Sequence, residues 1–103
     1  MINNVVISDS ITNVLLVPAG KTYAGVGMYF CNTSSESDTL TVYVVPDGAL
    51  ASDTNTVLKD ISISAKDTFE FGAEKFLLEQ GDKIAAKSAA GSRISATVTY
   101  TEI

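Results

Sequence analysis

The chain has 103 residues, the size of one small domain, and 46% of them are hydrophobic. Seven Lys and Arg face twelve Asp and Glu, which gives a formal net charge of -5. An acidic surface repels a phosphate backbone, so nucleic acid is not expected as a partner. His and Trp are absent and Cys31 is the single cysteine, which argues against a disulfide, a multi-cysteine zinc site and imidazole-based proton transfer. We therefore expect no cofactor and no metal.

The beginning of the chain, MINNVVISDS, has no basic region and no long apolar core, so no signal peptide is expected. No apolar run approaches the roughly 20 residues that a membrane helix needs, so we expect no membrane partner. These features predict a chain that is made in the cytoplasm. The tripeptide Asn32-Thr33-Ser34 matches the N-glycosylation sequon, and without a secretory signal we interpret the match as chance.

Strand-forming residues dominate the chain, and turn residues interrupt them at short intervals. In chain order, we predict strands at residues 4–8, 12–17, 23–32, 39–45, 56–64 and 68–71, two short strands around a turn at 80–82 within residues 77–88, and a last strand at 93–102. VPAG at residues 17–20 and Pro46-Asp47-Gly48 predict turns of the same chemistry, the first of them type I, and residues 49–55 have room for one helical turn. Turn signals roughly every 8 to 12 residues are typical of an all-β sandwich or barrel.

Side-chain alternation within the strands predicts which face is buried, and it is cleanest at residues 39–45. Clean alternation favours antiparallel sheets with one face against the core. We therefore predict a single antiparallel β-sandwich domain over residues 1–103, jelly-roll-like or immunoglobulin-like, with about eight strands. On the faces opposite the core stripes, four residues form a candidate interface: Tyr29, Cys31, Tyr43 and Val45. The alternative is a two-layer sandwich in which loops partly cover both faces.

The stretch VPAGKT at residues 17–22 ends in Gly-Lys-Thr, the tail of the phosphate-binding loop of nucleotide hydrolases. That loop needs a glycine five positions before the Gly of this tripeptide, where the chain has Leu15. Pro18 also removes a backbone N–H from the phosphate cradle, and a strand rather than a helix is predicted to follow. We interpret VPAGKT as a hairpin turn.

Two pairs of carboxylates, Glu36 with Asp38 and Asp47 with Asp53, are candidates for acid–base chemistry. Both pairs lie in polar loops, where carboxylates ordinarily face solvent. Four loop residues carry oxygens suited to calcium, in a spacing that matches no known calcium loop: Asp47, Asp53, Asn55 and Asp60. The chain is therefore not expected to be an enzyme.

The order of its segments gives the chain a family resemblance. VPAGKT is followed by YFCNTSSESDTLTVYVVPDG, TVLKDISISAKDTFEF, FLLEQGDKIAAKS and ISATVTYTEI. Over nearly the full length this order resembles small β-sandwich virion structural proteins of tailed bacteriophages. Members of that group serve as capsid decoration, head fibres, or parts of the neck, collar, baseplate or tail. The shared motifs are turns and strand ends, and the resemblance brings no catalytic residues with it.

The resemblance implies a virion protein that binds other phage structural proteins of the capsid, neck or tail. It also implies a homo-oligomer, with a trimer as one arrangement, and symmetric assembly is a common way for a small domain to gain stability. The alternative function is a carbohydrate-binding or adhesion module, in which Tyr23, Tyr29 and Tyr43 stack on sugars.

Overall fold

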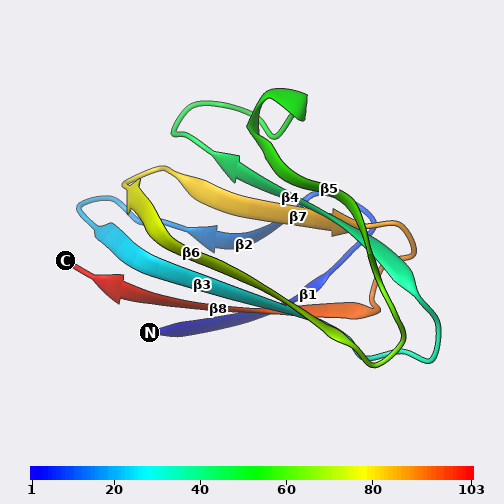
Figure 1. Ribbon diagram of the computed structural model, residues 1–103. Coiled ribbons are helices and arrows are strands. Elements are labelled where there is room, and N and C mark those ends of the chain that lie inside the picture. Colours follow the sequence, from blue (N-terminus) through cyan, green and yellow to red (C-terminus); the bar gives the residue numbers. More distant parts are fainter.

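The computed structural model describes the backbone of residues 1–103 and all side chains except those of residues 25 and 73–76. Within this description, eight strands form two four-stranded antiparallel sheets that lie one above the other (Figure 1). The strands are β1 (Ile2–Ile7), β2 (Thr12–Leu16), β3 (Thr22–Asn32), β4 (Asp38–Val45), β5 (Thr56–Ile63), β6 (Thr68–Glu79), β7 (Lys83–Ser88) and β8 (Ile94–Glu102). The predicted antiparallel β-sandwich with about eight strands is confirmed.

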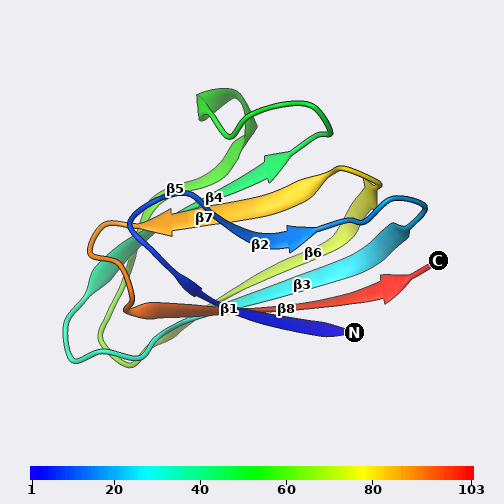
Figure 2. The same ribbon diagram turned by 180° about the vertical axis from the view of Figure 1, so that it is seen from behind.

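The strand order is that of a jelly roll. One sheet is ordered β1-β8-β3-β6 and the other β2-β7-β4-β5. Each strand of the first half of the chain therefore pairs with one of the second half: β1 with β8, β2 with β7, β3 with β6 and β4 with β5. This is one long hairpin folded across itself, the arrangement of a double-sheet jelly roll rather than of an immunoglobulin sandwich. Consecutive strands mostly change sheet, so most connections lie at the two ends of the sandwich (Figure 2).

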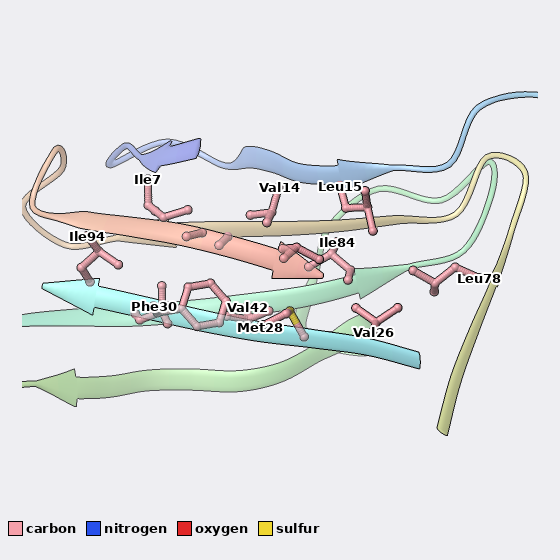
Figure 3. Close-up of a cluster of buried hydrophobic side chains, with 14 of the residues drawn as sticks. Ile7, Val14, Leu15, Val26, Met28, Phe30, Val42, Leu78, Ile84 and Ile94 are labelled. Atoms are coloured by element: carbon pink, nitrogen blue, oxygen red, sulfur yellow. The ribbon is translucent and has the colours of Figure 1, made fainter. Parts of the chain in front are cut away.

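The core lies between the two sheets and consists of the stripes that alternation predicts. Val26, Met28 and Phe30 of β3 are fully buried, and they pack in one cluster with Val42 of β4 and Ile84 of β7 (Figure 3). Each such side chain contributes about 1.5–3 kcal/mol when it is removed from water. One continuous core therefore holds both sheets together.

Two strands predicted as separate are one. β6 is a continuous strand of 12 residues, whereas the sequence predicted strands at 68–71 and again at the start of 77–88. Its partner β3 is almost as long and pairs with it on both sides of a register shift between Ala24 and Val26. Pairing with a long neighbour therefore extends the strand through a segment whose own pattern does not indicate one.

In both Pro-x-Gly turns, Pro is the first residue of the turn, whereas the type I interpretation of VPAG required it to be the second. Lys21 N donates to the carbonyl of Pro18 at 3.2 Å, so Pro18 is the first residue of its turn and Gly20 the third. Gly20 has a φ of +79°, a left-handed conformation that glycine adopts without steric penalty, and Gly48 at the second turn has +82°. This is the glycine position of a type II turn rather than a type I turn. A strand rather than a helix follows at Thr22, as predicted. The interpretation of VPAGKT as a hairpin turn was wrong, because β2 and β3 are not paired and this turn connects two different sheets.

The predicted helical turn within residues 49–55 is the 3-10 helix η1 (Asp53–Asn55). Ser52 caps it: the Ser52 hydroxyl accepts a hydrogen bond from Thr54 N at 3.3 Å, and the Asn55 side-chain oxygen accepts one from Ser52 N at 3.0 Å. This reciprocal cap gives the loop after β4 a defined shape.

Candidate functional site

The four predicted interface residues do not form one surface, because β3 and β4 belong to different sheets. Tyr29, which is 41% exposed, and half-buried Cys31 lie on the outer face of the β1-β8-β3-β6 sheet. Tyr43 and Val45 lie on the outer face of the other sheet, where both are buried. The prediction of a single patch was therefore wrong, since strand alternation does not reveal which sheet a strand joins.

The face around Tyr43 is covered by the chain itself. Tyr43 and Val45 form a small cluster with Ala85 of β7, and Ala49 and Ala51 of the following loop pack against it. Figure 1 shows this loop and its short helix above β4 and β5, on the side away from the other sheet. A loop therefore covers part of this sheet, as in the alternative that the sequence left open.

The central part of the outer face of the β1-β8-β3-β6 sheet carries little charge among the side chains that the structure describes. The strand register places its central outward residues in three rows across the four strands. We call these twelve residues the neutral face: Ile2, Thr99, Gly27 and Gly72; Asn4, Thr97, Tyr29 and Glu70; Val6, Ser95, Cys31 and Thr68. Glu70 is the one charged residue among them, in a chain with seven basic and twelve acidic residues. The connections of this sheet lie at its ends in both views, so they leave the face open (Figures 1 and 2).

Several large apolar side chains are exposed on this side of the molecule. Ile2 is 69% exposed, Val6 58% and Tyr29 41%, and Leu77 further along β6 is 55% exposed. Small hydroxyl-bearing residues of β8 separate them, and the exposed apolar groups thus lie in a polar setting. Apolar side chains that are exposed singly are ordinary on a protein surface, so they support an interface here only together with the low charge of the neutral face.

A hollow of ≈ 200 Å³ lies within the neutral face. Gly27 and Gly72 are paired directly across β3 and β6, and they have no side chains to fill the space above the backbone. Tyr29, Glu70 and Thr99 line it too. A Cβ atom at Gly27 would lie 3.1 Å from the Thr99 hydroxyl oxygen, so a larger residue there would force Thr99 to move. The hollow is therefore bordered by an aromatic ring, a carboxylate and a hydroxyl.

Of the three tyrosines that the sequence offered for sugar stacking, Tyr29 is exposed and the other two are buried. Tyr23 packs against Tyr100 with ring centroids 4.3 Å apart and ring planes inclined at 30°. Burial and, after it, the neighbouring Tyr100 raise the pKa of Tyr23 above its usual value. Tyr43 lies beneath the loop after β4.

The predicted carboxylate pair Glu36 and Asp38 is divided between two roles. Glu36 faces solvent and forms an ion pair with Arg93 at 2.7 Å. Asp38 is buried, and its Oδ1 accepts hydrogen bonds from Thr39 N at 2.8 Å and Ala90 N at 3.1 Å. Its Oδ2 has no hydrogen-bond partner within the described part of the chain. Asp38 therefore ties the loop after β7 to the start of β4.

The four candidate calcium ligands are engaged in separate local contacts. Asp53 forms an exposed ion pair with Lys59 at 3.2 Å, and this hydrogen bond raises the pKa of Lys59. Asn55 closes the cap of η1, Asp60 contacts a threonine of β4, and the backbone N–H of Asp47 donates to another aspartate. Among the residues whose side chains are described, no cluster of three His, Cys, Asp or Glu is placed to hold a metal ion.

The sequon residue Asn32 is fully buried, so it is closed to glycan attachment. Its amide nitrogen donates to the carbonyls of Glu36 at 2.8 Å and Ile63 at 3.1 Å. Its amide oxygen accepts from the backbone and hydroxyl of Ser34 at 3.0 and 2.8 Å. The interpretation of the sequon as a chance match agrees with this burial.

No protein-family model matches the chain, and neither a curated protein nor a solved structure matches it. Within the described residues, no helix has the length and apolar character needed to cross a membrane.

Proposed function

We propose that this chain is a structural component of a tailed-bacteriophage particle, which binds another virion protein of the capsid, neck or tail and also self-associates. The observation that carries the proposal is the neutral face, an open sheet surface with one charged residue in a protein of net charge -5. Charged residues are depleted at the centres of protein interfaces, whereas the rest of a soluble surface retains them.

The assignment to a bacteriophage particle comes from the family resemblance. The motifs on which it rests all lie at turns or strand ends of the jelly roll, as they would in a sandwich of that group. Jelly rolls occur in viral capsid proteins and in lectins, so the fold is compatible with both functions that the sequence suggested and selects neither.

The proposal is tested by locating the chain in intact phage particles that carry a tagged copy of it. We expect the tag at fixed, repeated positions in images of the particle. The variant Val6→Thr, which removes exposed apolar area from the neutral face, should reduce incorporation. Leu50→Thr removes a more exposed side chain from the loop over the other sheet and should not. Particles that lack the tag altogether would contradict the proposal.

A carbohydrate-binding role is the second candidate, and the hollow beside Tyr29 favours it. An exposed ring next to a carboxylate and a hydroxyl is suited to stack on a sugar ring and to bind its hydroxyl groups. A glycan array probed with the wild-type protein and with Tyr29→Thr tests this role. Binding of a defined glycan that Tyr29→Thr abolishes would support it, and an array without signal would contradict it.

A further inference from the structure

We infer that the neutral face is a twofold self-association surface, in which Tyr29 of each copy inserts into the Gly27–Gly72 hollow of the other. The inference rests on the proposed function, since it names the surface and the symmetry of the self-association proposed there. It commits to a second copy of this chain as the occupant of the hollow.

The charge distribution favours a second copy on this face. Two copies of a protein with a net charge of -5 repel each other, and an acidic residue directly opposite another one destabilises the contact. On the neutral face, Glu70 is the single carboxylate among twelve outward residues. The outer face of the other sheet carries Lys59, Asp60 and Lys87 and is partly covered by the loop after β4. Two copies that meet through the neutral face therefore bring few like charges together.

The shape of the face is self-complementary. Tyr29 projects one row away from the paired Gly27 and Gly72, on the same strand as Gly27. A twofold axis in the plane of the interface, running across the strands between these two rows, brings the Tyr29 of each copy over the hollow of the other. The contact is isologous, because the same two features meet twice.

The groups around the hollow suit a tyrosine. The hollow is ≈ 200 Å³ in volume, enough for a phenol ring. Glu70 at its rim is exposed and can accept a hydrogen bond from the hydroxyl of the inserted ring. Tyrosines that fill pockets are among the residues that contribute most to binding at protein interfaces.

The area of the face places the dimer among weak contacts. The three rows span Ser95–Thr99 of β8, a length of ~17 Å, and four strands ~4.8 Å apart are ~19 Å wide, which gives a flat area of ~320 Å². A standard interface buries roughly 800 Å² of accessible surface per partner, so this one lies below that size. We therefore expect a weak dimer, with a Kd high enough that the dimer dissociates on dilution.

Sedimentation equilibrium of the purified wild-type chain over a range of concentrations measures this Kd directly. We expect twice the mass of the monomer at high concentration and the monomer mass on dilution. Tyr29→Thr should weaken the dimer at least about 100-fold, because each dimer loses two buried rings. Leu50→Thr, at a loop position that is 82% exposed, should leave the Kd unchanged.

A second variant tests the hollow itself by adding a side chain. Gly27→Thr places a side chain in the hollow and should also weaken the dimer, although Tyr29 is intact. The close approach to Thr99 makes some loss of stability expected, so thermal melting must first show that the variant is folded.

Mixing the two variants gives the sharpest result. A mixed dimer retains one intact contact, between the Tyr29 of the Gly27→Thr copy and the open hollow of the Tyr29→Thr copy. The two substituted positions then face each other, so the added side chain occupies space that the missing ring leaves. We expect the mixture to dimerise more tightly than either variant alone, which a generally adhesive surface would not do.

The outcomes separate this inference from the proposed function. A wild-type monomer at all concentrations, a trimer, or a dimer that Tyr29→Thr leaves intact would overturn the inference, even if the tagged chain is found in phage particles. A dimer with the expected variant pattern would support it, even if particles lack the chain. A glycan bound at the hollow of a monomer would also overturn it.

Discussion

Asn32 joins three segments at one end of the sandwich: the end of β3, the loop that follows it, and the end of β5. It is fully buried and makes four hydrogen bonds, to Ser34, Glu36 and Ile63. We predict that Asn32→Ala lowers the free energy of unfolding by about 2–4 kcal/mol, because buried polar groups of three segments lose their partner. Urea denaturation measures the change. Asn13→Ala, at an exposed position of β2, is the control, and equal effects of the two variants would contradict the assignment.

Tyr23 makes the stability of the fold depend on pH in the alkaline range. Burial and, after it, the neighbouring Tyr100 raise its pKa in the folded state above the ordinary value of 10.0, which the unfolded chain retains. The folded state therefore retains its proton where the unfolded state has lost it, and stability falls as pH rises from about 10 through the raised pKa. We predict that the melting temperature of Tyr23→Phe falls less than that of the wild type as the pH rises above 10. An unchanged alkaline decline in this variant would contradict the role of Tyr23.

Three turns interlock at the opposite end of the molecule. In the turn after β6, Gly81 N donates to the carbonyl of Val17, and Val17 N donates to the carbonyl of Asp82, both at 3.0 Å. The Asp82 carboxylate accepts hydrogen bonds from Asp47 N and Glu79 N, both at 2.9 Å. The turns after β2 and β4 are therefore both tied to the turn between β6 and β7, and this end of the sandwich is closed by hydrogen bonds.

Two glycines of these turns form a matched pair that tests whether the turns contact each other at this end of the sandwich. Gly20 and Gly81 have φ angles of +79° and +85°, so alanine at either position is strained by about 1–2 kcal/mol. A Cβ at Gly20 has open space around it, whereas one at Gly81 would collide with the Asp47 carboxyl group. We predict that Gly81→Ala lowers the free energy of unfolding by at least about 1 kcal/mol more than Gly20→Ala. Thermal melting of both variants compares them, and equal losses would show that the turns are not in contact.

The elements were predictable from the sequence wherever a local pattern defines them. Alternation placed Val26, Met28 and Phe30 in the core, and the Pro-x-Gly segments marked two turns. The middle of β6 was missed because pairing with β3, rather than its own pattern, makes it a strand. The turn type was missed because the left-handed φ of Gly20 depends on where the turn begins.

Two of the four predicted interface residues were placed correctly from the sequence. Tyr29 and Cys31 were correctly placed opposite the core stripe of β3, but Tyr43 and Val45 are on the other sheet and under a loop. The neutral face combines residues from both ends and the middle of the chain, and its rows exist because β8 pairs between β1 and β3. Such long-range pairing leaves no signal within a single strand, so the hollow between Gly27 and Gly72 could not be foreseen.

At the scale of the whole molecule, the folded hairpin gives the sandwich two different outer faces. Adjacent strands β3 and β4 separate into different sheets, so the covered face with Tyr43 and the neutral face with Tyr29 lie on opposite sides. The neutral face is the one by which we propose that the protein assembles.

The thiol of Cys31 lies on the neutral face and reports directly on whether that face is covered. The measurement is the rate at which a maleimide labels Cys31 as protein concentration increases. The control is Leu50→Cys with Cys31→Ser, whose thiol lies on the loop over the other sheet. We predict that labelling of Cys31 slows in proportion to the loss of monomer while the control stays constant. A Cys31 rate that is independent of concentration, in protein shown to self-associate, would contradict assembly through this face.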